Sequence, residues 1–314
     1  TNSMLVQPVN HNILINPSFT VKQRGDVVDH NEASYGPDRW KFRGVDGTKG
    51  TMSQSSTDST TGINKLVVKH RNAESHTYTF QRIEAVNLLG LYGKEMTFSF
   101  SYSDKGGSGV PKVRIYSWDS SDNHKDLFDA VPTSLGDNRW TCTVTLSTMN
   151  GAIPDPSESG MEVYIYPNEK NTAPAEWSVW ETKLEVGSVA TPFIARPYSE
   201  ELALCHRYYF RIGGVPNIKP VIGTGMAYNT NDCFVPVRFP VKMRSIPSMS
   251  YDKIPRSYIP SDSRPLSALT LGTAESTSQE VRLVGTDPSY FTAGNASWFQ
   301  IDLGGTYVDF DAEL

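Results

Sequence analysis

The sequence predicts an all-β protein, with a jelly-roll β-sandwich over residues 12–195 followed by a short helix and a smaller C-terminal β domain. Short segments that alternate apolar and polar side chains recur along the whole chain, which is typical of strands with one buried face. Gly, Pro, Ser, Thr and Asn are abundant between them, as expected for strands joined by turns. At 314 residues the chain is long for one hydrophobic core, so two domains are expected.

The sandwich is predicted from alternating segments in the first two thirds of the chain. The clearest is 96–102, where Met96, Phe98, Phe100 and Tyr102 fall on one face because successive side chains of a strand point to opposite sides. The other predicted strands are 13–15, 38–42, 50–54, 65–70, 77–83, 112–118, 141–146, 161–166 and 177–186. Turn residues separate these segments at a spacing that favours an antiparallel sandwich.

A short helix is predicted within a linking segment at residues 196–214. Ser199 is a candidate N-cap, and Glu200 and Glu201 stand in the first turn, where the helix dipole favours carboxylates. The helix is therefore expected to begin just after Tyr198. Residues 1–11, at the other end of the sandwich, are polar and irregular and are interpreted as an N-terminal arm or attachment segment.

The smaller β domain is predicted over residues 215–314, where the alternating pattern returns. Its expected strands are 221–228, 234–239, 248–251, 280–284, 298–302 and 307–310. Pro236 cannot donate a backbone hydrogen bond, so its strand is expected at a sheet edge or at a bulge.

Charge and cysteine content exclude several classes of function. The formal net charge is −5 and no basic stripe with interleaved aromatic residues is present, so nucleic acid is not an expected partner. No apolar segment approaches the length of a membrane span, so membrane insertion is not expected. Cys142, Cys205 and Cys233 are odd in number and widely spaced, which predicts buried thiols and neither a disulfide framework nor a metal site.

Aromatic side chains on two predicted strands are the candidate ligand contacts. A flat ring covers the apolar face of a sugar, while neighbouring polar side chains take its hydroxyl groups. The candidate glycan-binding residues are two pairs of aligned rings and the polar loop after the first pair, namely Tyr116, Trp118, Asp119, Asp122, Asn123, Tyr164 and Tyr166. Trp177 and Trp180 are further candidates by the same reasoning. The alternative for any of these rings is that it points into the core.

Several short segments resemble one family in its order along the chain. They are 12–19 (with Asn16-Pro17), 23–25, 35–40, 185–193, 196–202, 205–209, 234–244 and 308–314. On these segments the chain resembles bacteriophage tail-fibre and tail-tip receptor-binding proteins that carry a carbohydrate-binding-module-like jelly roll. The resemblance implies a non-catalytic virion protein of the phage tail, made in the host cytoplasm, that binds host cell-surface polysaccharide. It also implies other phage tail proteins as partners and a homotrimer.

Two other functions remain as alternatives. The first is a purely structural tail-fibre or baseplate component whose jelly roll contacts other virion proteins. The second is a fragment of a glycan-depolymerising tail spike, which is disfavoured because the sequence has no internal repeat of the kind that builds long β-helices. No catalytic residue is assigned, because the acidic clusters fall in predicted loops where their separation is undefined.

No cofactor is expected, and a structural calcium ion is possible but disfavoured. Modules of the resembled type hold calcium with an acidic residue just after the first Asn-Pro and with carboxylates near the last strand. Here Thr20 stands where that carboxylate would be needed, and a hard cation requires several charged oxygen ligands. Glu181 and Glu185 remain near the end of the sandwich as the other potential ligands.

Overall fold

The computed structural model describes residues 12–30, 33–44, 50–70, 76–105, 107–118, 124–147, 160–169, 175–302 and 306–313. These residues belong to two compact units, of which the first ends at Glu201 and the second begins at Leu202. Nearly all regular structure is antiparallel β-sheet, which confirms the all-β prediction. Among the described helices, none combines the length and hydropathy needed to span a membrane. The predicted arm at 1–11 lies outside the described residues.

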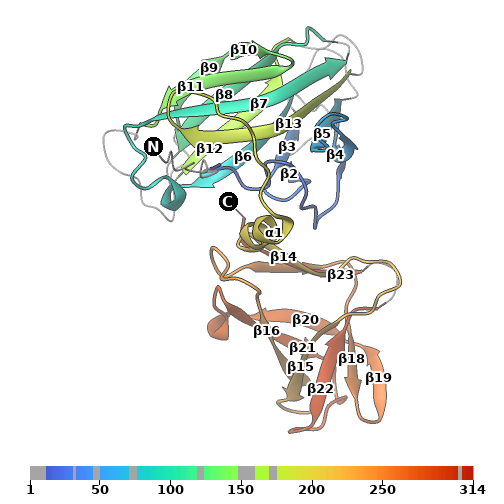
Figure 1. The fold of residues 1–314 in the computed structure, drawn as a ribbon. Coiled ribbons are helices and arrows are strands. Elements are labelled where there is room, and N and C mark those ends of the chain that lie inside the picture. Colours follow the sequence, from blue (N-terminus) through green and yellow to red (C-terminus); the bar gives the residue numbers. More distant parts are fainter. Residues whose placement is uncertain are drawn as a thin grey trace, which may run out of the picture. The chain divides into compact units, whose positions relative to one another are not determined.

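The first unit is a sandwich of two antiparallel sheets, drawn as separate layers in Figure 1. One sheet has seven strands in the order β1-β4-β5-β13-β7-β11-β10, and the other has six in the order β2-β3-β6-β12-β8-β9. The strands are β1 (Val27–His30), β2 (Ser34–Tyr35), β3 (Lys41–Gly44), β4 (Gly50–Thr57), β5 (Asn64–His70), β6 (Thr77–Glu84), β7 (Glu95–Lys105), β8 (Pro111–Trp118), β9 (His124–Ala130), β10 (Thr133–Gly136), β11 (Arg139–Thr145), β12 (Gly160–Pro167) and β13 (Ala175–Val186), with a 3-10 turn at Ala85–Leu88.

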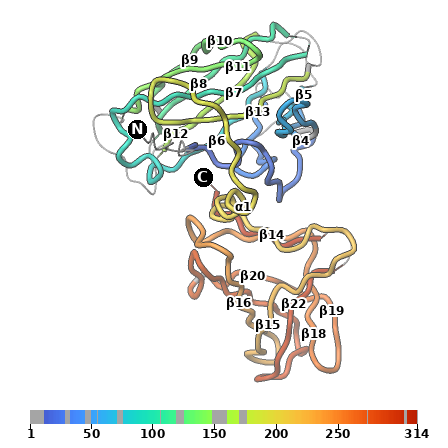
Figure 2. The backbone as a smooth tube through the Cα atoms, viewed as in Figure 1, coloured from blue at the N-terminus to red at the C-terminus, as the bar shows by residue number. Residues whose placement is uncertain are grey.

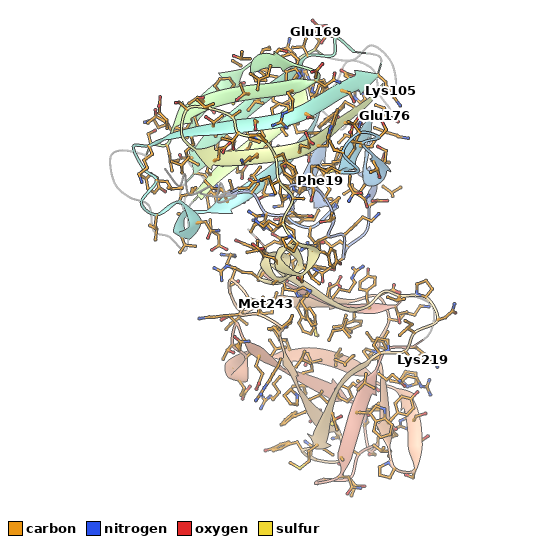
Figure 3. The ribbon with its side chains drawn as sticks, viewed as in Figure 1. Phe19, Lys105, Glu169, Glu176, Lys219 and Met243 are labelled. Carbon is orange, nitrogen blue, oxygen red and sulfur yellow. The ribbon has the colours of Figure 1, made fainter. Side chains whose placement is uncertain are left out.

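The core of the sandwich lies between the two sheets and follows the alternation of the sequence. Met96, Phe98, Phe100 and Tyr102 of β7 are all buried, which confirms that they share the inward face. Ile115 and the other inward residues of β8 and β12 meet them from the six-stranded sheet. The charged ends of the long strands stay at the surface, as at Lys105 and Glu176, whose Nζ and Oε1 atoms lie 3.0 Å apart (Figure 3).

The predicted strand at 13–15 is wrong, although its residues are buried. Side chains rather than a neighbouring strand satisfy much of its backbone. Gln81 accepts from the Ile15 N–H (2.9 Å) and donates to the Ile15 carbonyl (2.7 Å), and Asn12 Oδ1 accepts from the Leu14 N–H (3.1 Å). The apolar run predicted the burial of Leu14 and Ile15 correctly, but the contacts of Gln81 come from a residue too distant in sequence for a pattern to reveal.

A buried ion pair lies where the first unit ends. Arg196 donates to both carboxylate oxygens of Glu201, at 3.1 and 3.2 Å, and to the Leu14 carbonyl at 3.0 Å. The Asn16 N–H donates to the same carboxylate at 2.5 Å. Glu201 therefore holds the Asn16-Pro17 segment, and both belong to segments that carry the family resemblance.

The helix α1 (Tyr198–His206) contains the point at which the two units divide. It begins at Tyr198, so Ser199 lies inside its first turn and not before it, which corrects the predicted N-cap. The segment 209–213, predicted to belong to the linking segment, instead forms a strand of the second unit that pairs with the last strand of the chain.

The second unit contains a three-stranded and a seven-stranded sheet, in the orders β14-β23-β17 and β19-β18-β22-β15-β16-β21-β20. The backbone of this unit runs from yellow to red in Figure 2. The strands are β14 (Tyr209–Gly213), β15 (Val221–Ala227), β16 (Asp232–Arg238), β17 (Ser248–Tyr251), β18 (Arg256–Ile259), β19 (Asp262–Pro265), β20 (Ala268–Gly272), β21 (Glu280–Thr286), β22 (Ala296–Gln300) and β23 (Tyr307–Asp311), with a 3-10 turn at Thr273–Glu275.

The strand that contains Pro236 is internal to its sheet, so the edge prediction is wrong. β16 lies between β15 and β21. Its ladder to β15 includes only Cys233 and Phe234, whereas its ladder to β21 continues past the proline to Arg238. The proline is tolerated because it lies beyond the part of β16 that is paired on both sides.

Candidate functional site

The outer face of the six-stranded sheet carries rings and charges in place of the usual polar surface. In β12 the odd-numbered residues Met161, Val163 and Ile165 point into the core. The even-numbered residues Glu162, Tyr164 and Tyr166 therefore stand on the opposite face. The same alternation applies to the neighbouring β6 and β8, so three adjacent strands contribute large side chains to one outer surface.

These side chains line a hollow that we call the aromatic cleft. Its volume is about 540 Å³, and it is lined by Ala33, Lys41, Arg43, Tyr78, Phe80, Arg82, Arg114, Tyr116, Asp129, Tyr164 and Tyr166. The lining comes from β3, β6, β8, β9 and β12, together with one residue just before β2. A cavity of this size lies within the range of small-molecule sites.

Five rings pack against one another in the cleft. Phe80 and Tyr164 are stacked at 4.3 Å between ring centroids, and Tyr116 stacks on the other side of Tyr164 at 5.6 Å. Tyr78 stands nearly perpendicular to Tyr164, with an interplanar angle of 82°, and lies 4.6 Å from Tyr166. Phe80, Tyr164 and Tyr166 are buried, whereas Tyr78 and Tyr116 are half-buried, so these two rings have area left for contact with a ligand.

Strand register places charged side chains on both sides of these rings. In one row across the sheet, Lys41 pairs with Phe80, Phe80 with Tyr164, Tyr164 with Arg114 and Arg114 with Asp129. In the next row Arg43 pairs with Tyr78, and Tyr166 pairs with Lys112. Each row thus has a cation from β3 on one side of its rings and a cation from β8 on the other.

A buried carboxylate below the cleft holds two of its lining side chains. Glu162 is fully buried; it forms an ion pair with Arg82 and accepts a hydrogen bond from the Tyr116 hydroxyl. The hydroxyls of Tyr116 and Tyr164 lie 3.2 Å apart. Both carboxylate oxygens are engaged, so the role of Glu162 is to position the arginine and the phenol.

Burial and this carboxylate together shift the pKa values of the lining groups. Burial, with the charge of Glu162 as the next cause, raises the pKa of Tyr116 and of Tyr164 well above the ordinary 10.0. Burial alone lowers the pKa of Arg82, but the attraction of Glu162 outweighs it, and the pKa is raised above its usual value. At neutral pH the cleft therefore offers neutral phenols and permanently charged guanidinium groups.

The structure brings together three of the seven candidate residues. Tyr116, Tyr164 and Tyr166 line the aromatic cleft. Trp118 stands on the same face, but its side chain is only 8% exposed and is not part of the lining. It lies beneath the Arg82 guanidinium, whose Cζ is 5.3 Å from the centroid of the Trp118 ring. Asp119, Asp122 and Asn123 lie outside the described residues.

The two further tryptophan candidates belong to the other sheet. Trp177 is fully buried in the core, where its Nε1 donates to Thr77 Oγ1 at 3.1 Å. Trp180 is buried beneath Lys65, whose Nζ lies 3.9 Å from its ring centroid.

The contributions of β3 and β6 to the cleft were not predicted from the sequence. β6 alternates Thr77, Thr79 and Gln81 with Tyr78 and Phe80, and ordinary patterning would bury the rings. Instead the polar residues face inward, where Thr79 donates to the Lys41 carbonyl (3.2 Å) and Gln81 holds Ile15. The signal available was that the polar residues at the odd-numbered positions of β6 are uncharged and able to form hydrogen bonds within a core, whereas the rings share the even-numbered positions with Arg82 and Glu84.

Among the described residues, no group of three or more His, Cys, Asp or Glu side chains is placed to hold a metal ion. Of the two carboxylates considered for calcium, Glu181 Oε2 lies 3.3 Å from Arg139 Nη1. Glu185 Oε2 lies 3.0 Å from Lys183 Nζ and accepts from the Thr191 hydroxyl at 2.6 Å. Both carboxylates are therefore engaged by protein donors.

Comparison with known proteins yields similarities in structure alone. No protein-family model matches the chain, and no curated protein sequence matches it. Similar solved structures include the enzymatically active domain of tailspike protein 4 of bacteriophage CBA120, at 11% identity and a TM-score of 0.32, over 48% of this chain and 19% of that one. Another is the N-terminal cellulose-binding domain of Cellulomonas fimi β-1,4-glucanase C, at 14% identity and 0.32, over 49% and 93%.

A third is the CBM22-1 xylan-binding domain of Paenibacillus barcinonensis Xyn10C, at 11% identity and a TM-score of 0.32, over 58% of this chain and 98% of that one. At TM-scores of this size the similarities do not bear on what this chain binds. The chain spans about a fifth of the tailspike structure that it matches.

Proposed function

We propose that this protein is a non-catalytic glycan-binding protein and that the aromatic cleft is its binding site. The observation that carries the proposal is that aromatic rings and fixed polar side chains line the same cleft. Tyr78 and the neighbouring rings offer apolar contact to the C–H face of a sugar, while Arg43, Arg114 and Asp129 offer hydrogen-bond donors and an acceptor at the rim.

The environment of the carboxylates supports a binding role over hydrolysis. Glycoside hydrolysis normally requires one carboxyl group that can give up a proton and a second that can act as nucleophile or base. Glu162 is engaged on both oxygens by Arg82 and Tyr116, and Asp129 Oδ1 lies 2.9 Å from Lys112 Nζ. Both acids are used to hold neighbouring side chains.

The biological setting that we propose is the tail of a bacteriophage virion, where the protein would bind host cell-surface polysaccharide. This part rests on the sequence resemblance alone. A homotrimer and contacts with other phage tail proteins belong to the same proposal. An observation that favours such protein contacts is the apolar outer face of the second unit, where Met226, Tyr228 and Trp298 are 58%, 66% and 38% exposed.

The binding proposal is tested by affinity electrophoresis of the intact chain against a panel of soluble neutral and acidic polysaccharides. Tyr78→Ala is expected to weaken binding of the best ligand roughly tenfold, which corresponds to about 1.4 kcal/mol. The matched control is Tyr228→Ala, which removes an exposed ring from the second unit and is expected to leave binding unchanged. Equal losses in the two variants, or no binding to any member of the panel, would refute the cleft as a glycan site.

A further inference from the structure

Arg114 lines the aromatic cleft from β8, and its guanidinium is held on two sides. Its Nε donates to Asp126 Oδ1 at 2.8 Å. Its Cζ lies 5.1 Å from the centroid of the Tyr116 ring, so the planar group also packs against an aromatic side chain. The side chain is nevertheless 35% exposed. Arg114 therefore combines a fixed position with access for a ligand.

The contact with Asp126 leaves the terminal nitrogens of Arg114 for other partners. A guanidinium carries several N–H donors in a fixed planar fork, and Asp126 accepts from the one on Nε. Among the described residues, Nη1 and Nη2 of Arg114 have no hydrogen-bond partner. Two donors in one plane suit a group that presents two neighbouring oxygen atoms.

Two carboxylates of β9 act on the Arg114 guanidinium. Asp126 accepts its hydrogen bond, and Asp129 pairs with Arg114 across the β8–β9 ladder. The hydrogen bond with Asp126, together with the charges of Asp126 and Asp129, outweighs burial and raises the pKa of Arg114 above its usual value. A ligand carboxylate at this guanidinium would stand beside two groups of like charge, which disfavours it. A pair of hydroxyl groups meets no such repulsion.

The half-buried ring of Tyr78 lies close enough to Arg114 for one sugar to contact both. Burial raises the pKa of Tyr78, and the positive charge of Arg114 is one of the causes that oppose this shift. The hydroxyl groups of a sugar project mainly from the edge of its ring. A sugar whose apolar face covers Tyr78 therefore presents its hydroxyl groups sideways, where the guanidinium can reach them.

We propose that Arg114 determines the specificity of the aromatic cleft by donating from Nη1 and Nη2 to two adjacent hydroxyl groups of a sugar that lies on Tyr78. The inference rests on the glycan-binding function proposed above and names the group of the sugar that is recognised. A sugar without one of these hydroxyl groups leaves one nitrogen without its acceptor and binds more weakly.

The test replaces Arg114 by lysine, which keeps the positive charge but has no planar fork. Intact protein is titrated calorimetrically with mixed-linkage β-glucan, galactomannan, polygalacturonate and carboxyl-reduced polygalacturonate. Arg114→Lys is expected to bind the best neutral polymer roughly tenfold more weakly than the wild type, a difference of about 1.4 kcal/mol. Arg114→Gln is a second variant, without the charge, and is expected to lose binding to a similar extent.

The matched control is Arg238→Lys in the second unit. Arg238 Nε lies 2.6 Å from Glu280 Oε2, so this arginine is also paired through Nε, but it is far from the cleft in sequence and belongs to the other unit. Its replacement is expected to leave binding unchanged. Urea unfolding of Arg114→Lys at the wild-type midpoint shows that a loss of binding is not a loss of fold.

Two results would overturn the proposal. The first is wild-type affinity of Arg114→Lys for the neutral polymers. The second is a loss confined to polygalacturonate, or binding of polygalacturonate without its carboxyl-reduced form, which would assign Arg114 to a carboxylate instead. In either case a loss of binding in Tyr78→Ala would still support the cleft as a glycan site. If the wild type bound none of the polymers, the proposed function would fail as well.

Discussion

The six-stranded sheet of the first unit and the seven-stranded sheet of the second unit both carry aromatic residues on an outer face, but these residues are arranged differently. In the first unit Phe80, Tyr164 and Tyr166 are only 3%, 8% and 7% exposed, because they pack together below a rim of charged side chains. In the second unit Tyr258 and Trp298 stack at 5.2 Å with an interplanar angle of 6°, yet Trp298 is 38% exposed. Recessed rings suit a ligand that fills a hollow, whereas an open ring pair suits a flat apolar surface.

The two aromatic surfaces also differ in the contacts that hold their rings in place. The rings of the cleft are fixed by polar contacts from below, through the hydroxyls of Tyr116 and Tyr164 and the buried Glu162. The rings of the second unit rely on stacking, as for Tyr228 on Phe234 at 4.9 Å. Breaking the polar support should therefore damage the first surface far more than any single substitution damages the second.

The largest expected effect comes from Glu162→Ala. Removing this carboxylate leaves Arg82 partly buried without its ion-pair partner, which typically costs about 3–5 kcal/mol of stability. Urea unfolding followed by tryptophan fluorescence measures the change. The control is Asp129→Ala, whose surface pair with Lys112 should contribute about 1 kcal/mol or less. Similar costs for the two variants would contradict the supporting role of Glu162.

The second effect is on assembly and concerns the open face of the second unit. If this face joins copies of the chain, light scattering of the intact protein at micromolar concentration should give a trimer. Met226→Lys/Trp298→Lys should reduce it to a monomer because it places two charges on the contact surface. The double variant Lys41→Gln/Arg43→Gln, which removes two charges from the cleft, should stay trimeric. A monomeric wild-type chain would refute self-association through this face.

The smallest expected effect is a loss of stability at alkaline pH to which the buried tyrosines of the cleft contribute. Burial, followed by nearby carboxylates, raises the pKa of Tyr116, Tyr164 and Tyr166 above the ordinary 10.0. A raised pKa in the folded state means that stability is fully present below pH 10 and declines as the pH rises above it.

Urea melts at pH 9 and pH 11 measure this decline. Replacing Tyr116, Tyr164 and Tyr166 by phenylalanine should reduce it, since phenylalanine does not titrate, whereas Tyr228→Phe should leave it as in the wild type. A triple variant with an unchanged alkaline decline would show that the tyrosines of the cleft are not its source.

Much of the fold could be predicted from the sequence because alternation has a direct physical cause. The inward face of β7, the strands at 112–118 and 161–166, and the buried cysteines all follow from which residues avoid water. The pattern was not sufficient where side chains replace a strand partner, as Gln81 does for Ile15. The pattern also predicted wrongly that the strand of Pro236 lies at a sheet edge. The number of residues that pair on each side of a strand depends on the neighbouring strands, which the pattern does not show.

The candidate site could be predicted only in part. Tyr116, Tyr164 and Tyr166 were recognised because they alternate with aliphatic residues that had to be buried. Alternation alone could not place Trp118, which shares their face but lies beneath Arg82. The cations of β3 were missed because a short strand such as Lys41–Gly44 gives little pattern, and its position beside β6 is a long-range contact.

The most direct test of the account is a crystal structure of the intact protein with an oligosaccharide derived from the polymer that binds best. The account predicts that the sugar lies in the aromatic cleft, with one of its rings against Tyr78. A sugar bound instead on Tyr258 and Trp298 of the second unit, with the cleft unchanged, would contradict it.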